Sequence, residues 1–116
     1  MNPTTSHGWK DIAFFRKHWD GPIVLKGIQT VEDAQHSIEA SCQGIVVSNH
    51  GGRQVDGGVA SLDMLPQIAK AVGDMIDIFF DSGIRSGADI AKALALGAKT
   101  VLVGRPYVYS LSLIHI

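Results

Sequence analysis

Short apolar runs alternate along the chain with stretches in which apolar residues recur every three or four positions. The apolar runs span residues 22–28, 44–49, 77–83 and 100–106. Each is short and rich in Val, Ile, Leu or Phe, which is typical of strands in a parallel sheet that is buried on both faces. The pattern therefore predicts four buried strands.

The stretches between these runs have helical spacing and begin with residues that favour helix starts. The predicted helices span residues 7–19, 30–42, 61–73 and 86–98. Thr30 and Ser61 are candidate N-caps, Ser86 and Asp89 form a candidate cap pair, and Gly73 is expected to end the third helix. The first helix carries an aromatic stripe (Trp9, Ile12, Phe15 and Trp19) that is expected to face the core.

Helices and strands in strict alternation imply parallel strands joined by crossover helices. Four such units form either an open α/β sheet or half of a (β/α)8 barrel. A complete barrel needs about 250 residues, whereas this chain has 116.

The amino-acid composition argues against several classes of function. The net charge of −1 gives no electrostatic case for binding nucleic acid or an anionic membrane. Cys42 is the only cysteine, the five histidines are scattered, and no metal-ligand spacing appears. No apolar run approaches a membrane span, and the N-terminus does not resemble a signal peptide. A cytoplasmic protein without a metal site is expected.

Unusual polar residues follow the C-terminal end of every predicted strand. They are Lys26, the segment 48–53, the segment 81–85, and the pair Gly104 and Arg105. In parallel α/β folds this edge of the sheet binds ligands. A site assembled from all four strand ends is therefore predicted.

The segments "DSGIRSG" and "VGRP" predict a phosphate site. Gly83, Gly87 and Gly104 allow backbone N–H groups to approach an anion. Arg85 and Arg105 can add charged hydrogen bonds, and the start of the following helix adds its dipole. The alternative is a pair of glycine turns with solvated arginines.

The motif "SNHGGR" combines a base with a carboxylate-binding group. A neutral His50 can accept a proton near pH 7, and the planar fork of Arg53 suits a carboxylate. Together they suit proton abstraction from an acid held by its carboxylate. The alternative is a structural histidine that binds loop carbonyls.

These motifs resemble the FMN-dependent α-hydroxy-acid oxidases and dehydrogenases, which include glycolate oxidase and lactate-oxidising enzymes. The resemblance covers residues 9–109 and rests on "LKGI", "VVSNHGGRQVDG", "FDSGIRSGADIAKALALGA" and "VLVGRP" in that order. "SNHGGRQ" is highly specific, whereas the phosphate loops also occur in other FMN barrels. Ser82 occupies a position where many members of the family have glycine.

The resemblance implies an α/β fold, the C-terminal half (strands five to eight) of a TIM barrel, and FMN as cofactor. The implied FMN-binding residues are Lys26, Ser48, Asp81, Ser82, Gly83, Ile84, Arg85, Gly104 and Arg105. It further implies that His50 is the active-site base and that Arg53 binds the substrate carboxylate. The implied reaction oxidises a small L-2-hydroxy acid, such as lactate or glycolate, to the 2-oxo acid in a homo-oligomeric intact protein.

Two departures from the family pattern set further expectations. Strands one to four, with the substrate-binding tyrosines and the carboxylate that orients the histidine, have no counterpart here, so the isolated chain is expected to be inactive. Residues 1–110 are expected to form the partial enzyme domain. "LSLIHI" at 111–116 resembles a translated sequencing adapter and is expected to be a non-native tail.

Two alternatives stay open at this stage. Another FMN barrel, such as a nucleotide dehydrogenase or a flavin-dependent isomerase, would share the phosphate loops but would not call for His50 with Arg53. A non-catalytic half-barrel that binds only phosphate or flavin is the second alternative.

Overall fold

A computed structural model describes residues 8–53 and 57–114 of the chain. Its elements are α1 (Trp9–His18), β1 (Val24–Ile28), α2 (Val31–Glu39), β2 (Gly44–Val47), the 3-10 turn η1 (His50–Gly52), α3 (Ser61–Val72), β3 (Asp77–Phe80), α4 (Gly87–Ala95), β4 (Thr100–Val101) and α5 (Arg105–Ile114). The predicted helix start at residue 7, residues 54–56 of the polar motif, and residues 115–116 lie outside the described residues.

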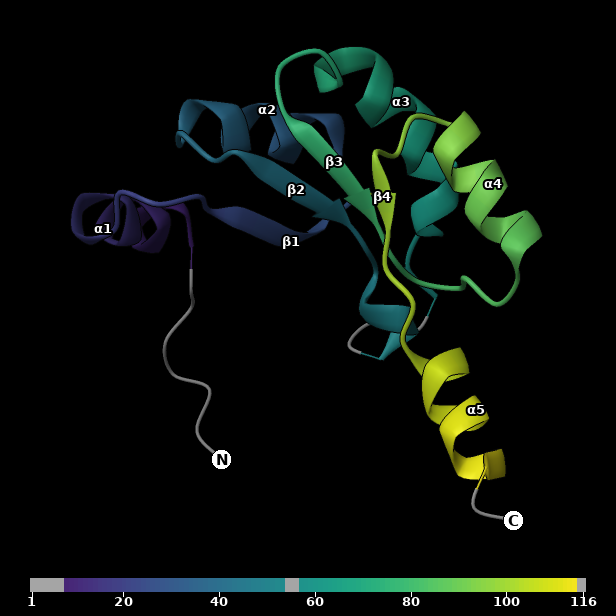
Figure 1. Ribbon diagram of the computed structural model, residues 1–116. Coiled ribbons are helices and arrows are strands. Elements are labelled where there is room, and N and C mark those ends of the chain that lie inside the picture. The colour runs from purple at the N-terminus through teal and green to yellow at the C-terminus, as the bar shows by residue number, and fades with distance from the viewer. Residues whose placement is uncertain (1–7, 54–56, 115–116) are drawn as a thin grey trace.

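The four strands form one parallel sheet in the order β1-β2-β3-β4 (Figure 1). Ile45 of β2 pairs with Leu25 on one side and with Ile78 on the other, so the apolar positions of neighbouring strands are in register. This arrangement confirms the predicted succession of parallel βα units. The C-terminal ends of all four strands therefore lie at the same edge of the sheet. Lys26, which was predicted to follow the first strand, lies inside β1, two residues before its end.

Local sequence signals explain where the helices begin. Thr30 Oγ1 accepts a hydrogen bond from Asp33 N at 3.1 Å and caps α2. Ser86 and Asp89 form the predicted reciprocal capping box at the start of α4. The prediction for α3 was wrong by one residue, because Ala60 is the cap and Ser61 is the first residue of the helix, where it is buried.

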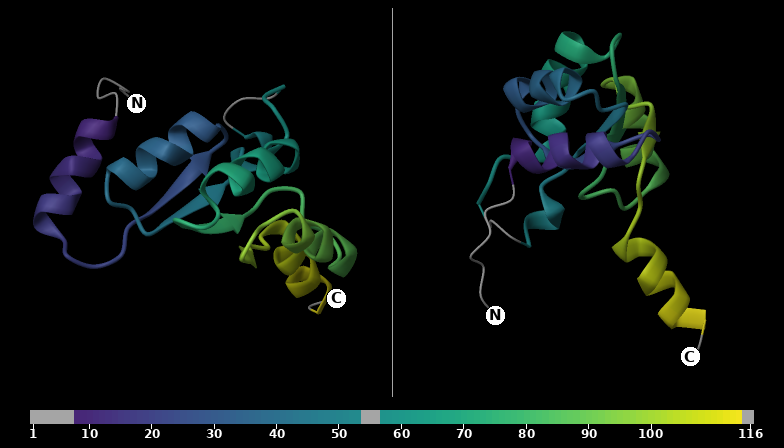
Figure 2. Two further views of the ribbon diagram at one scale, coloured as in Figure 1. Left: turned by 90° about the horizontal axis from the view of Figure 1, so that it is seen from above. Right: turned by 90° about the vertical axis from the view of Figure 1, so that its left-hand side faces the viewer.

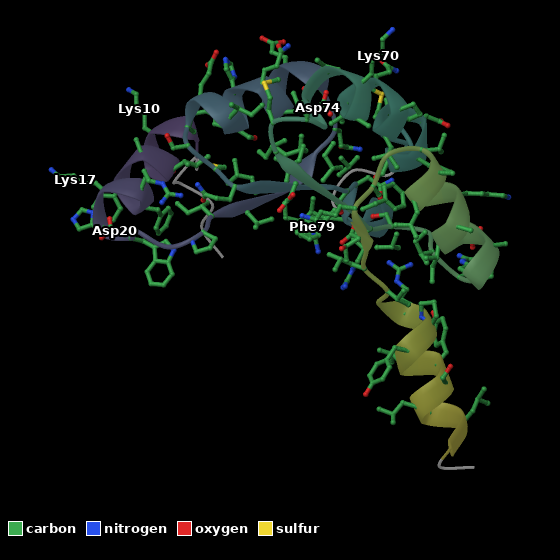
Figure 3. The ribbon with its side chains drawn as sticks, turned by 45° about the horizontal axis from the view of Figure 1, so that its top comes forward. Lys10, Lys17, Asp20, Lys70, Asp74 and Phe79 are labelled. Carbon is green, nitrogen blue, oxygen red and sulfur yellow. The ribbon has the colours of Figure 1, made fainter. Side chains whose placement is uncertain are left out.

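The core lies between the sheet and the helices. Ile45, Val47, Ile78 and Phe80 point from the strands into it, and Leu65, Ile68 and Val72 of α3 pack against them. Figure 3 shows helices α1 to α4 along the convex side of an arc, with Lys10, Lys17 and Lys70 directed outward. The sheet lies on the concave side, where the labelled Phe79 is found.

Burial on both faces of the sheet was expected for every strand but holds only for β2, in which all four residues are buried. In β1, Val24 is 46% exposed and Lys26 is exposed as well. Both alternate with the core-facing Leu25, so they point to the concave side, which no described helix covers (Figure 2).

Two further expectations were wrong in detail, and one helix was not predicted. The stripe of α1 does not face the core: Trp9, Phe15 and Trp19 are exposed, and only Ile12 packs against buried residues. The fourth strand is two residues long instead of 100–106, because Leu102 to Gly104 form a loop. Helix α5 was not predicted, and it projects away from the sheet (Figures 1 and 2).

No helix within residues 8–53 and 57–114 is both long enough and apolar enough to cross a membrane.

Candidate functional site

A cavity of about 790 Å³ lies at the C-terminal edge of the sheet. Its walls are formed by Lys26, His50, Gly51, Arg53, Asp81, Ser82, Gly83, Ile84, Arg85, Leu102, Val103, Gly104, Arg105, Pro106 and Tyr109. The site residues predicted from the sequence line this cavity, with the exception of Ser48 and Gly87. The structure therefore brings together four segments that are separated along the chain.

Lys26 and Asp81 form an ion pair at the base of the cavity. Lys26 Nζ lies 3.0 Å from Asp81 Oδ2, and the two residues come from β1 and the end of β3. Burial opposes ionisation of Asp81, but hydrogen bonds from Ser48, Ser82 and Lys26, together with the charge of Lys26, outweigh it and lower the pKa of Asp81 below its usual value. Asp81 is therefore a carboxylate at neutral pH.

The histidine turn, residues 50–52, presents His50 to the cavity. All three of its residues have left-handed backbone angles, with φ of 59° at His50, 64° at Gly51 and 72° at Gly52. Glycine adopts this conformation at little cost, and histidine is among the few other residues that are enriched there. Because His50 is exposed, its imidazole is accessible to a ligand in the cavity.

Side chains from two strand ends hold the histidine turn. Ser48 Oγ accepts a hydrogen bond from His50 N at 3.1 Å, and Ser82 Oγ accepts one from Gly51 N at 3.1 Å. A methyl group built on Gly51 would lie 3.1 Å from Arg105 Nη2, so the guanidinium lies directly against this glycine. The turn is thus in contact with the loops that follow both β3 and β4.

Two arginines and two open glycines line the part of the cavity that follows β3 and β4. At Gly83 and Gly104 no atom lies within 4 Å of the position that a Cβ would occupy, so the backbone there is open to close approach. Arg85 and Arg105 add positive charge to the same wall. Exposed backbone and guanidinium groups are donors suited to a phosphate.

The start of α4 contributes less to this site than its sequence suggested. Asp89 Oδ2 accepts hydrogen bonds from Arg85 N at 3.0 Å and from Ser86 N at 3.1 Å. These hydrogen bonds lower the pKa of Asp89 below its usual value, and the bond from Arg85 N has the largest effect. A carboxylate therefore already occupies the positive end of the helix and offsets its dipole.

Positively charged side chains outnumber negatively charged ones in the cavity wall. Lys26, Arg53, Arg85 and Arg105 line it, and Asp81 is the one carboxylate among the lining residues that the structure describes. Such a wall favours a ligand with anionic groups, and its volume lies in the range of cofactor and substrate sites. FMN, with its phosphate and its ribityl chain, fits this set of donors and this volume.

Sequence reasoning missed five lining residues: Gly51, Leu102, Val103, Pro106 and Tyr109. Gly51 carried a signal, because it stands between His50 and a second glycine in a turn. Tyr109 carried none, because its place depends on the position of α5. Ser48 is buried behind the wall and reaches the cavity through its contacts with His50, Asp81 and Ser82.

Cys42 lies away from this site. It is buried in the core after α2, and burial raises the pKa of its thiol despite the opposing charge of Arg16. A neutral, enclosed thiol is not a nucleophile for a ligand in the cavity.

Comparison with known proteins places this site in context. The sequence pattern of the family described as FMN-dependent dehydrogenase matches residues 1–115. An FMN-dependent alpha-hydroxy acid dehydrogenase of Schizosaccharomyces pombe is 72% identical over 111 residues, which cover 96% of this chain and 27% of that protein. An L-lactate dehydrogenase of Caulobacter sp. (strain K31) is 52% identical over 104 residues, which cover 90% of this chain and 27% of that protein.

Among solved structures, mandelate oxidase with (S)-mandelic acid superposes with a TM-score of 0.83 at 53% identity. The superposition covers 86% of this chain and 30% of mandelate oxidase. The parallel sheet and its helices are therefore part of a TIM barrel, as predicted, and the chain spans about a quarter to a third of the length of the proteins it matches. With the fold, the cavity and these relatives in agreement, the chain belongs to the FMN-dependent dehydrogenase family.

Proposed function

We propose that this chain contributes the catalytic base, the carboxylate-binding group and most of the FMN site to an enzyme that oxidises an L-2-hydroxy acid to the 2-oxo acid. The observation that carries the proposal is the shared cavity. His50 and Arg53 line the same space as Arg85 and Arg105. A base, a carboxylate-binding group and a phosphate site are thus within reach of one bound cofactor and one substrate.

The proposed FMN site draws on all four strand ends. The backbone of Gly83, Ile84 and Gly104 and the guanidinium groups of Arg85 and Arg105 would hold the phosphate. Asp81, Ser82 and, from behind, Ser48 would border the ribityl chain. FMN supplies the two-electron acceptor when it is bound, and the protein supplies its orientation and the charge around it.

Lys26 has a distinct role in this proposal. Its ammonium group is anchored by Asp81 at 3.0 Å, yet the side chain remains 48% exposed on the cavity side. A fixed positive charge there stabilises negative charge that develops on a neighbouring group. We assign Lys26 to the edge of the flavin ring that becomes anionic on reduction.

His50 and Arg53 act on the substrate. The guanidinium of Arg53 holds the carboxylate of the hydroxy acid, which fixes the carbon that carries the hydroxyl group. The imidazole of His50 accepts one proton from the substrate as the hydroxyl carbon becomes a carbonyl. The two residues are one turn apart, since Arg53 N donates a hydrogen bond to His50 O at 3.3 Å.

The activity belongs to a longer protein in this proposal. The relatives that carry the activity names are three to four times as long as the matched segment. The 116-residue chain alone is expected to show no turnover with lactate or glycolate, because the concave side of its sheet is open. The intact protein is expected to be a homo-oligomer, as the family resemblance implies, and light scattering would measure this.

The test uses a hybrid in which residues 9–109 replace the corresponding segment of mandelate oxidase, a relative whose structure has been solved with (S)-mandelic acid. The hybrid is expected to purify with FMN, and anaerobic (S)-mandelate is expected to bleach its flavin absorbance. A second hybrid in the Schizosaccharomyces pombe relative, which is 72% identical, guards against a mismatch with the host.

Three results would contradict the proposal. A folded hybrid without flavin would exclude the FMN site. A hybrid that holds flavin but is not reduced by mandelate, lactate or glycolate would favour a different FMN barrel, which reduction by a nucleotide substrate would identify. Turnover by the 116-residue chain alone would contradict its expected inactivity.

A further inference from the structure

Ser82 follows β3 and lies beside the histidine turn, between this turn and the Lys26–Asp81 ion pair. We propose that Ser82 is a positioning residue: its hydroxyl fixes the histidine turn to the Lys26–Asp81 ion pair and so holds His50 in its working orientation. This inference deepens the proposed function and rests on it for the role of His50.

Ser82 forms hydrogen bonds both to the histidine turn and to the ion pair. Its Oγ accepts a hydrogen bond from Gly51 N at 3.1 Å and donates one to Asp81 Oδ1 at 2.8 Å. Asp81 Oδ2 in turn receives Lys26 Nζ at 3.0 Å. An unbroken chain therefore runs from the Gly51 amide through one hydroxyl and one carboxylate to the ammonium group of Lys26.

The protonation state of Asp81 decides which partner of the Ser82 hydroxyl accepts a hydrogen bond and which donates one. A serine hydroxyl has one hydrogen to donate and lone pairs that accept. Asp81 is a carboxylate at neutral pH, so it can only accept; the hydrogen of Ser82 is drawn to Asp81 and a lone pair is left for Gly51 N–H. Bonds in such a chain polarise and strengthen one another.

No other described side chain from a different strand end donates to or accepts from the backbone of the turn. Gly52 N and Arg53 N bond to Asn49 O and His50 O within the same segment, and Ser48 belongs to the strand end that leads into the turn. These bonds shape the turn but do not fix it relative to β3. Ser82 supplies that cross-connection.

The backbone at Ser82 supports a functional reading of the hydroxyl. Its φ is 88°, a region that glycine occupies freely and that costs another residue about 1 kcal/mol or more. Strained residues of this kind cluster at functional sites. Glycine would relieve the backbone but would leave Gly51 N–H and Asp81 without this partner.

The test compares Ser82→Gly with Ser82→Ala in the mandelate oxidase hybrid. Both variants remove the hydroxyl, but only glycine also relieves the backbone, so an effect common to both belongs to the hydroxyl. We expect kcat to fall about fivefold in each, as for the loss of one hydrogen bond. The KM for mandelate should stay within about twofold, because Arg53 is untouched. Because Ser82 also borders the proposed FMN site, kcat is expressed per bound flavin in each variant.

Ser41→Gly is the matched control. Ser41 is the other described serine with a positive φ, 61°, but it lies after α2 at the opposite edge of the sheet. Its replacement should leave kcat, KM and FMN content as they are. Amide hydrogen exchange at Gly51 provides a readout without turnover, and it should be about fivefold faster in both Ser82 variants and unchanged in Ser41→Gly.

Two outcomes would overturn the inference. One is an unchanged kcat together with unchanged Gly51 exchange in both Ser82 variants. The other is a kcat that falls only in proportion to FMN content or thermal stability, which would leave Ser82 a residue of the cofactor site or of the fold and not a positioning residue for His50. If the parent hybrid is not reduced by mandelate, the proposed function fails, and the exchange measurement still decides whether Ser82 holds the turn.

Discussion

The two edges of the sheet use arginine in opposite ways. At the N-terminal edge, Arg16 of α1 donates to four acceptors of the protein itself: Trp19 O, Gly21 O, Ser41 O and Gln43 Oε1, at 2.9 to 3.2 Å. These bonds join α1 to the segments that lead into β1 and β2. Arg16 is therefore a structural residue whose two terminal nitrogens, Nη1 and Nη2, donate within the fold.

At the C-terminal edge, the guanidinium groups of Arg53, Arg85 and Arg105 line a cavity and are exposed. Within the described residues no side-chain hydrogen bond or ion pair of these three is found, although Arg105 lies against Gly51. Their donors face the cavity. The same residue type thus bonds within the fold at one edge and is proposed to bind ligands at the other, as expected for a (β/α) barrel.

The largest expected effect on turnover comes from a substitution at the C-terminal edge of the sheet, where the cavity lies. His50→Asn in the hybrid should lower mandelate turnover about a thousandfold, because it removes the proposed general base. Asparagine also tolerates a positive φ, so the turn should be preserved. Stopped-flow flavin reduction measures the effect, with FMN content as the control. A loss of less than about tenfold would remove His50 from the role of base.

Arg53→Lys tests whether the fork of the guanidinium matters more than its charge. Lysine keeps the charge but cannot bind a carboxylate in a bidentate manner. We expect kcat/KM for mandelate to fall about thirtyfold, mostly through KM, with FMN content unchanged. A variant with an unchanged KM would show that the substrate carboxylate is bound elsewhere.

Arg16→Met tests the structural edge. Loss of the charged donors should lower the free energy of unfolding by about 2 kcal/mol, measured by urea denaturation of the hybrid. FMN content and mandelate turnover of the folded fraction should not change. Lys17→Met is the matched control, because Lys17 points away from the sheet (Figure 3) and its replacement should cost little. Equal effects of the two substitutions would contradict the structural role of Arg16.

The smallest expected effect is a dependence of stability on acid pH through Asp81. Its pKa in the folded protein lies below the unfolded value of 3.8, so its ionised form stabilises the fold at higher pH. This contribution should be fully present above about pH 4 and be lost as the pH falls through the folded pKa. Asp81→Asn should flatten the slope of unfolding free energy against pH in that range; an unchanged slope would assign it to other carboxylates.

The sequence was sufficient for the order of helices and strands from α1 to β4 and for ten of the fifteen residues of the cavity wall. Alternating periodicity predicted the parallel sheet, and the position of each polar motif after a strand predicted which residues would meet, since parallel strands end at one edge. The caps Thr30 and Ser86 were readable because capping is a local interaction.

What could not be predicted depends on contacts between distant segments. The stripe on α1 has helical spacing, but whether it is buried depends on neighbours that periodicity does not specify. The approach of Arg105 to Gly51 and the bonds of Ser82 depend on how two loops fold back over the sheet. The end of β4 was misplaced because "VLVG" stays apolar after the strand has ended.

The left-handed backbone of the histidine turn also limits how this site can evolve. A β-branched or bulky residue at position 50 would be penalised by the φ of 59° before its chemistry could be selected. Only glycine, asparagine, aspartate and histidine enter that conformation readily, and histidine alone among them titrates near neutral pH. The shape of the turn therefore leaves few mutational routes by which a descendant protein could exchange its base for another.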